Sequence, residues 1–274
     1  MPQKKEIYFH VGLPKTASTF LQQKIFPRFK GVHFTRKRYT DKYPEIVVNT
    51  DHNKFLFSCE YADNLEVKLD LLEQRFPQAK VILVLRKHTG WISSKYKYHI
   101  RKHGSHDFRS FFDIYEDKGV LKQSDVVYEN FIRMIDSRFT NKPLILFQHE
   151  LKENPKQFIQ RIADYMEVEP PEKLPASKVN SSFSNRQLRV LLWLNRTYPY
   201  RLHKYPRGSF SRKLYYRYRQ YLLHTVAFFA NFMPWISKEK LIPEDDLYSI
   251  KNKYKADWKA CLEYASELEE AAYV

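Results

Sequence analysis

The first 170 residues alternate between short apolar runs and stretches with helical spacing. Four apolar runs predict strands over residues 7–11, 54–58, 81–85 and 144–147. Between these runs, apolar residues recur three and four positions apart, which predicts helices. The helices are expected over residues 19–25, 62–76, 88–103 and 154–167, with two more over 107–138 that break near Gly119. Residues 26–53 lack a clear period, so we expect mostly loop there.

This order of elements predicts an α/β fold. Unbroken apolar runs such as residues 81–85 are typical of parallel strands that are covered on both faces. Because short strands alternate with helices, we expect a three-layer architecture with a mainly parallel central sheet flanked by helices. A ligand crevice should then lie at the carboxyl ends of the strands.

After residue 170 the sequence predicts helices and no further strands. A proline-rich connection over residues 170–175 precedes them. These helices are expected over residues 186–196, 212–232 and 243–264. No repeat or low-complexity linker divides the chain. We therefore expect residues 1–274 to form one domain, with an α/β core over 1–170 and a helical C-terminal region over 171–274.

The composition limits the class of protein. Hydrophobic residues make up 43% of the 274 residues, which is enough for a sizeable core and argues against a disordered chain. The net charge of +16 favours an acidic partner, such as a nucleotide, a nucleic acid, an anionic glycan or an anionic membrane. Two distant cysteines, Cys59 and Cys261, argue against a disulfide framework and a structural zinc site. With no leader peptide visible, we expect a cytoplasmic location.

The stretch over residues 7–22 predicts a strand, a tight loop and a helix. Its loop residues are Gly12, Pro14, Lys15, Thr16, Ala17, Ser18 and Thr19. A loop of this kind turns backbone N–H groups and a helix N-terminus toward one point, where it can hold a phosphate. It is not a Walker A loop, because no second glycine precedes Lys15. The alternative is an ordinary strand-to-helix turn with a surface lysine.

A second basic position follows the strand predicted over residues 81–85. Arg86 closes that strand, and Ser94 lies eight residues further on, inside the next predicted helix. Arginine suits a phosphate because its planar fork makes two parallel hydrogen bonds. Taken alone, the pair fits a surface arginine and a solvated serine better than a binding site.

The loop over residues 12–19 resembles the 5′-phosphosulfate loop of sulfotransferases that use 3′-phosphoadenosine 5′-phosphosulfate (PAPS). The spacing of Arg86 and Ser94 is similar to that of the pair that holds the 3′-phosphate in this family. Residues 145–155 are similar to the family's strand, acidic turn and helix. Residues 179–184, with Ser181 and Ser182, are similar to a segment that closes over the nucleotide in bacterial members.

The resemblance runs from about residue 7 to 197 and is weak over 26–53. It implies a P-loop-like nucleotide-binding fold over the core, with PAPS as co-substrate and adenosine 3′,5′-bisphosphate (PAP) as product. It requires no metal, and the sequence offers no clear metal cluster. The implied activity is transfer of a sulfuryl group to a hydroxyl by in-line displacement.

The resemblance also implies roles for two catalytic residues. Lys15 would stabilise the leaving oxygen of the donor. Glu60, just past the second predicted strand, resembles the base of carbohydrate-modifying members, so we expect a carbohydrate or glycolipid acceptor. An equally good alternative is that Glu60 caps the next helix. His33, His52 and His99 are rival bases.

Arginine and tyrosine alternate over residues 196–232, and no Asp or Glu lies among them. This pattern suits an anionic sugar chain, a lipid headgroup or a single-stranded nucleic acid. We expect peripheral contact with the inner membrane face through 212–236, and no nucleic-acid partner. Two other functions remain open, an ATP-dependent small-molecule kinase and a non-catalytic polyanion-binding protein.

Overall fold

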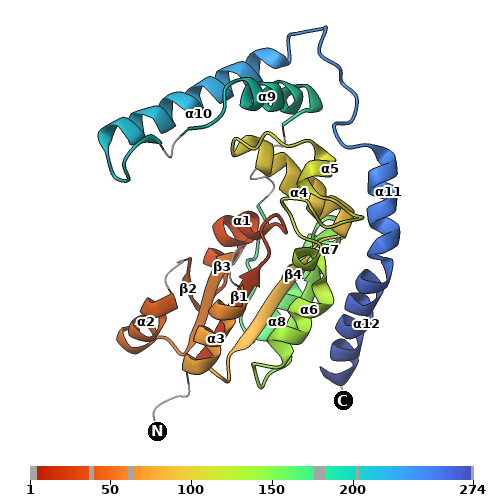
Figure 1. Ribbon diagram of the computed structural model, residues 1–274. Helices are drawn as coiled ribbons and strands as arrows, with labels where there is room; N and C mark the ends of the chain where they lie inside the picture. The colour runs from red at the N-terminus through yellow and green to blue at the C-terminus, as the bar shows by residue number, and fades with distance from the viewer. Residues whose placement is uncertain (1–4, 37–39, 61–64, 176–182, 202–203, 273–274) are drawn as a thin grey trace. The chain divides into compact units, whose positions relative to one another are not determined.

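The computed structural model describes residues 5–36, 40–60, 65–175, 183–201 and 204–272 (Figure 1). The chain forms two compact units. Unit 1 comprises residues 1–88, 127–179 and 254–274, and unit 2 comprises residues 89–126 and 180–253. The expectation that all 274 residues act as one domain stays a prediction.

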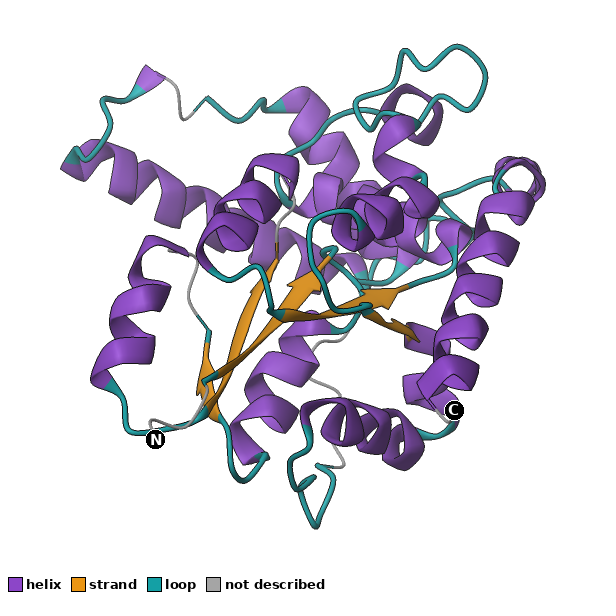
Figure 2. Ribbon diagram, turned by 90° about the horizontal axis from the view of Figure 1, so that it is seen from below, coloured by secondary structure: helices purple, strands orange, loops and turns teal. Residues whose placement is uncertain are grey.

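Unit 1 contains a five-stranded sheet in the order β2-β3-β1-β4-β5, in which every neighbouring pair is parallel. Figure 2 shows these strands side by side, and the α/β class predicted from the sequence is confirmed. The strands are β1 (Glu6–Gly12), β2 (His33–Thr35), β3 (Lys54–Glu60), β4 (Lys80–Leu85) and β5 (Leu144–Phe147). Because β1 lies between β3 and β4, the loop that follows β1 lies at the centre of the carboxyl edge.

The sheet of unit 1 is buried on both faces, as the apolar runs predicted. On one face, Tyr8 and Leu56 belong to a core that includes Phe26, Phe158 and Ile162. On the other face, Phe9 contacts an aromatic cluster, within which Tyr43 stacks on Phe57 at 4.0 Å between ring centroids. The helices of this unit are α1 (Ser18–Phe20), α2 (Tyr43–Asn49), α3 (Leu65–Arg75), α6 (Tyr128–Asp136), α7 (Gln148–Glu153), α8 (Pro155–Met166) and α12 (Lys255–Ala272).

The expectation of mostly loop over residues 26–53 is wrong, because β2 and α2 lie there. β2 has three residues at the edge of the sheet and pairs only with β3, so it carries no recognisable alternation. The helix expected over 19–25 is also irregular. After α1 the chain continues as a π-helical turn over Leu21–Ile25 and a 3₁₀ turn over Phe26–Arg28.

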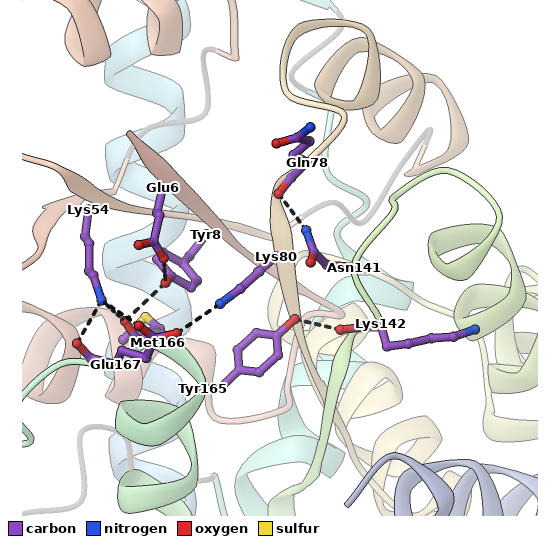
Figure 3. A network of polar contacts seen from close by, with 10 residues as sticks. All are labelled: Glu6, Tyr8, Lys54, Gln78, Lys80, Asn141, Lys142, Tyr165, Met166 and Glu167. Atoms are coloured by element: carbon purple, nitrogen blue, oxygen red, sulfur yellow. Dashed lines mark hydrogen bonds and ion pairs between the residues drawn. The ribbon is translucent and has the colours of Figure 1, made fainter. Parts of the chain in front are cut away.

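A polar network closes the amino ends of the strands, away from the carboxyl edge (Figure 3). The ammonium group of Lys54, at the start of β3, donates to the carbonyls of Met166 at 3.0 Å and Glu167 at 2.9 Å. The Tyr8 hydroxyl also donates to the Met166 carbonyl, at 3.1 Å. These donors satisfy carbonyls at the C-terminal end of α8, where cations are favoured.

Unit 2 is helical among its described residues. It contains α4 (His88–Arg101) beyond its first residue, α5 (Phe108–Phe111), α9 (Asn185–Thr197), α10 (Phe210–Ala230) and α11 (Glu244–Lys253). The helices α9 and α10 lie side by side (Figure 1). The buried Arg219 of α10 donates to the Asn195 side chain at 3.2 Å and to the Tyr198 carbonyl at 2.7 Å. These bonds join the inward face of α10 to α9.

Two helix predictions need correction. Over residues 107–138, the first helix is the single turn α5, and a 3₁₀ turn over Ser124–Val126 precedes α6. In the segment between them, the Asp113 carboxylate accepts backbone N–H bonds from Tyr115 and Glu116, which favours a turn over a helix. The single helix expected over 243–264 is divided into α11 and α12 at Tyr254.

None of the helices in the described part of the chain has the length and hydropathy needed to cross a bilayer.

Candidate active site

The carboxyl edge of the sheet in unit 1 brings together predicted site residues from three segments of the chain. In the parallel register of β1 and β3, Gly12 lies directly opposite Glu60. Arg86 follows β4, the strand on the other side of β1, and its Nη1 donates to the carbonyl of Lys15 at 3.1 Å. The loop therefore lies between a carboxylate and a guanidinium, which are 26 positions apart in the sequence.

The loop after β1 has a strained backbone. Lys15 and Ala17 adopt φ angles of 76° and 73°, in the left-handed region that non-glycine residues rarely occupy. Between them, the buried Thr16 donates its hydroxyl to the Leu13 carbonyl at 2.7 Å, which holds the turn. Alternation of this kind is typical of a nest, in which successive N–H groups face one anion.

Gly12 is closely packed and leaves little room for a side chain. A Cβ atom at this position would lie 3.0 Å from the Ser18 hydroxyl oxygen and 3.2 Å from the His10 ring. The glycine therefore allows the loop to close over the strand, with the buried Ser18 beneath it.

A buried polar cluster supports the loop from below, and the sequence reasoning missed it. The Nδ1 atom of His10 lies 2.7 Å from the Ser58 hydroxyl, which also accepts from the Gln22 amide at 3.0 Å. Burial lowers the pKa of His10 to about 4, so the ring is neutral near neutral pH. The other ring nitrogen, Nε2, is buried without a hydrogen-bond partner. His10 is near enough to Gly12 to shape the loop.

A second group of unit 1 residues supports Arg86. Burial lowers the pKa of Arg86, while the neighbouring Tyr128 acts in the opposite direction. The Tyr128 hydroxyl donates to the Arg86 carbonyl at 2.7 Å, and its buried ring stacks on His88 at 4.2 Å. Tyr128 therefore holds the segment after β4 at both Arg86 and His88.

Asp257 of α12 completes this support from a distant part of the sequence. Its carboxylate lies 2.8 Å from His88 Nε2 and accepts the backbone N–H groups of Tyr128 and Glu129 at 3.0 Å each. Burial raises the pKa of Asp257, but the bonds from His88 and from the two backbone groups outweigh it, so the pKa is lowered. One carboxylate thus caps α6 and orients the first residue of α4. No local motif in the sequence marks either role.

The remaining predicted residues are placed as follows. Pro14 and Thr19 lie half-buried in the loop and the turn that follows it. Ser94 lies in α4, in the part of that helix that belongs to unit 2. Ser181 and Ser182 lie outside the described residues.

Two of the rival histidines lie near the amino ends of the strands, away from the loop. His33 pairs with Phe55, near the start of β3, and its ring contacts that of His52, which precedes the strand. At ~3.3 Å per strand residue, the carboxyl edge is roughly 16 Å further along. His99 belongs to unit 2, where it lies 3.1 Å from His106. Of the candidate bases in the described part of unit 1, Glu60 is the one that shares the carboxyl edge with the loop.

Among the described residues, no group of three or more His, Cys, Asp or Glu side chains is placed to hold a metal ion.

The five parallel strands and the helices that flank them define an α/β protein. A family model described as "Sulfotransferase domain" matches residues 8–221, and the chain therefore belongs to the sulfotransferase family. A comparison with curated protein sequences found no significant match.

Solved sulfotransferase structures share the fold. A sulfotransferase from Alicyclobacillus acidocaldarius matches with a TM-score of 0.52 at 12% identity, over 64% of this chain and 87% of that chain. The mouse sulfotransferase SULT7A1, complexed with PAP, matches with a TM-score of 0.43 at 16% identity, over 69% of this chain and 64% of that one. The similarity to the Alicyclobacillus acidocaldarius structure supports the fold alone. The similarity to the mouse structure is too low to support a conclusion.

Proposed function

We propose that this protein transfers a sulfuryl group from PAPS to a hydroxyl acceptor by in-line displacement. The family match supports sulfuryl transfer, and the strained loop between Glu60 and Arg86 is the observation that supports a nucleotide donor. The residues fit such a donor. At Gly12 no side chain covers the loop backbone. The left-handed conformations of Lys15 and Ala17 form a nest suited to an anion.

The proposed chemistry rests mainly on positioning and charge. The donor supplies an activated sulfuryl group whose sulfur–oxygen bond to the 5′-phosphate breaks as the acceptor oxygen bonds to sulfur. Lys15 would stabilise the charge left on the bridging oxygen, while the loop N–H groups and hydroxyls bind the 5′-phosphate. Glu60 would accept the proton of the acceptor hydroxyl. Its place opposite Gly12 supports this role, since β1 and β3 deliver base and loop to one edge.

Arg86 is proposed to bind the 3′-phosphate. Its hydrogen bond to the Lys15 carbonyl couples it to the loop, and the fixed backbone of the segment after β4 supports a defined position. Ser94, Ser181 and Ser182 are proposed, from the resemblance alone, as further nucleotide contacts.

The acceptor is proposed to be a carbohydrate or glycolipid hydroxyl, and the location cytoplasmic. Glu60 as the base supports the first proposal, since a carboxylate resembles the base of carbohydrate-modifying members. PAP is the proposed product, and no metal is required by the displacement.

The test uses Lys15→Ala, with the exposed Lys156→Ala of α8 as the matched control. Thermal unfolding is measured for each protein with PAP and, separately, with ATP and magnesium. A ligand that binds only the folded state at a hundredfold excess over its Kd stabilises it by about 2.7 kcal/mol. We expect PAP to stabilise the wild type and the control, and Lys15→Ala to lose sulfuryl transfer by about a hundredfold or more.

Three outcomes would contradict the proposal. Full transferase activity in Lys15→Ala would remove the loop lysine from the chemistry. Stabilisation by ATP and magnesium but not by PAP would favour a kinase. Salt-sensitive polyanion binding that survives loss of Lys15, with neither ligand stabilising the fold, would favour a non-catalytic binder.

A further inference from the structure

The helix α10 carries apolar side chains on two opposite faces. Its inward face consists of the buried apolar residues Leu223, Ala227 and Ala230, with the buried Arg219 beside them. Its outward stripe consists of Phe210, Leu214, Tyr218, Tyr221 and Phe228, each more than half exposed. At 3.6 residues per turn, these five positions fall within an arc of roughly 80°. A soluble helix normally presents polar residues there, so this stripe requires a partner.

The stripe continues into an aromatic turn after the helix. Phe232 is 69% exposed and Trp235 is 78% exposed. The Phe228 ring contacts those of Phe229 and Phe232 at 5.5 and 5.4 Å, so these three rings form one cluster. We call Phe228, Phe229, Phe232 and Trp235 the aromatic tip.

The aromatic tip is held firmly within unit 2. Arg186 at the start of α9 donates to the carbonyl of Ile236 at 2.9 Å and to that of Asn231 at 3.3 Å. The amide of Gln187 donates to the Ala227 carbonyl at 3.1 Å. The turn that carries the exposed rings is thus fixed to α9 by hydrogen bonds.

The charge around the stripe has a single sign. Lys213 and Arg217 are exposed on α10 beside the apolar arc, and no Asp or Glu occurs anywhere between Glu172 and Glu239. A surface that combines inserted aromatic rings with flanking cations is complementary to an anionic bilayer, where rings enter the interface and cations meet headgroups.

We propose that α10 and the aromatic tip bind an anionic membrane surface. Phenylalanine rings clustered against one another favour a bilayer over a nucleic acid, because they form a continuous apolar wedge instead of separated stacking platforms. The proposal concerns only unit 2 and is independent of the sulfotransferase site. It also gives the protein access to acceptors held at a membrane.

The test is flotation of the full chain with vesicles of phosphatidylcholine alone and with vesicles containing one quarter phosphatidylglycerol. We expect binding to the anionic vesicles that weakens at high salt, and little binding to the neutral ones. The variants are Phe232→Ser with Trp235→Ser, and Lys213→Glu with Arg217→Glu. Each pair should lower the vesicle partition coefficient by about tenfold or more.

Matched controls come from exposed positions elsewhere in unit 2. Tyr115→Ser with Tyr248→Ser removes two aromatic rings, and Lys251→Glu changes one exposed charge, so both should leave partitioning within about twofold of the wild type. Circular dichroism and thermal unfolding verify that every variant is folded.

Three results would overturn the proposal. The wild type could fail to float with anionic vesicles. It could self-associate in light scattering through the aromatic tip, with the Phe232 and Trp235 variant monomeric, which would assign the tip to a second copy. It could bind a single-stranded oligonucleotide and ignore vesicles, which would assign the cations to a nucleic acid. PAP binding reports separately on the sulfotransferase site.

Discussion

At Lys15 and Ala17 the backbone occupies the left-handed region without a glycine, at a cost of the order of 1 kcal/mol or more for each residue. Such strain persists only where surrounding contacts determine it. Here those contacts are the Thr16 bond to Leu13 and the Arg86 bond to the Lys15 carbonyl. These contacts within the chain therefore hold the loop in the conformation that suits an anion.

The buried His10 should make stability depend on pH. Its pKa is lowered from 6.5 to about 4 by burial, so the unfolded chain binds the proton more readily. Stability is complete above about pH 6.5 and is lost as the pH falls toward 4. Between pH 7 and pH 5, protonation of this one group in the unfolded chain should lower the free energy of unfolding by about 2 kcal/mol.

The measurement is urea unfolding of the wild type, His10→Gln and the exposed His52→Gln at pH 7 and pH 5. Burial also lowers the pKa of His103 to about 4, and this residue is present in all three proteins, so its contribution is the same in each. We expect His10→Gln to lose about 2 kcal/mol less than the wild type over this interval, and His52→Gln to behave as the wild type. Equal losses in all three would mean that His10 does not stay neutral.

Arg86 provides a test of geometry as opposed to charge. Arg86→Lys keeps the positive charge but loses the planar fork, so PAP affinity should fall about tenfold or more. Isothermal titration with PAP measures it, and Arg133→Lys, at an exposed position on α6, is the control. Unchanged affinity in Arg86→Lys would remove the 3′-phosphate role.

At the scale of elements, α12 belongs to the same unit as the sheet, although it comes last in the chain. Asp257 caps α6 and pairs with His88, and Trp258 packs edge-on against Phe147 at 5.0 Å. These contacts join the helix to the end of β5 and to the segment that carries Arg86. The final helix is thus part of the core's support.

Asp257→Ala should therefore destabilise the protein by about 3 kcal/mol, because it leaves the buried His88 and two part-buried N–H groups unpaired. The pKa of Asp257 is lowered, so its contribution is present above its unfolded pKa and is lost as the pH falls below that value. Urea unfolding at pH 7 measures the effect. The exposed Asp245→Ala of α11 is the control, with an expected change of about 0.5 kcal/mol or less.

At the scale of the whole molecule, the net charge of +16 bears on association with anions. A cationic surface attracts an anionic nucleotide over a distance that salt shortens to ~8 Å at physiological ionic strength. The association rate for PAP should therefore fall several-fold between 50 and 500 mM salt, by a larger factor than the dissociation rate changes. Stopped-flow binding measures both rates. A salt-independent association rate would show that the net charge does not steer the ligand.

Much of the core was predictable because its signals are local. The runs that became β1, β3, β4 and β5 are mostly apolar, since both faces of these strands are buried. The loop was visible because Gly12 and Lys15 keep a recognisable spacing. β2 escaped prediction, since an edge strand of three residues has neither the length nor the burial that makes a pattern.

Local residue patterns were enough to predict the α/β class, the position of the loop and the residue types that can hold a phosphate, because each depends on neighbouring residues. Only the tertiary structure placed Glu60 opposite Gly12, set Arg86 on the Lys15 carbonyl, and brought Asp257 to His88. It also separated His33 and His52 from the loop. These pairings join segments that are 48, 71 and 169 residues apart. They follow from strand order and helix packing, which no local pattern encodes.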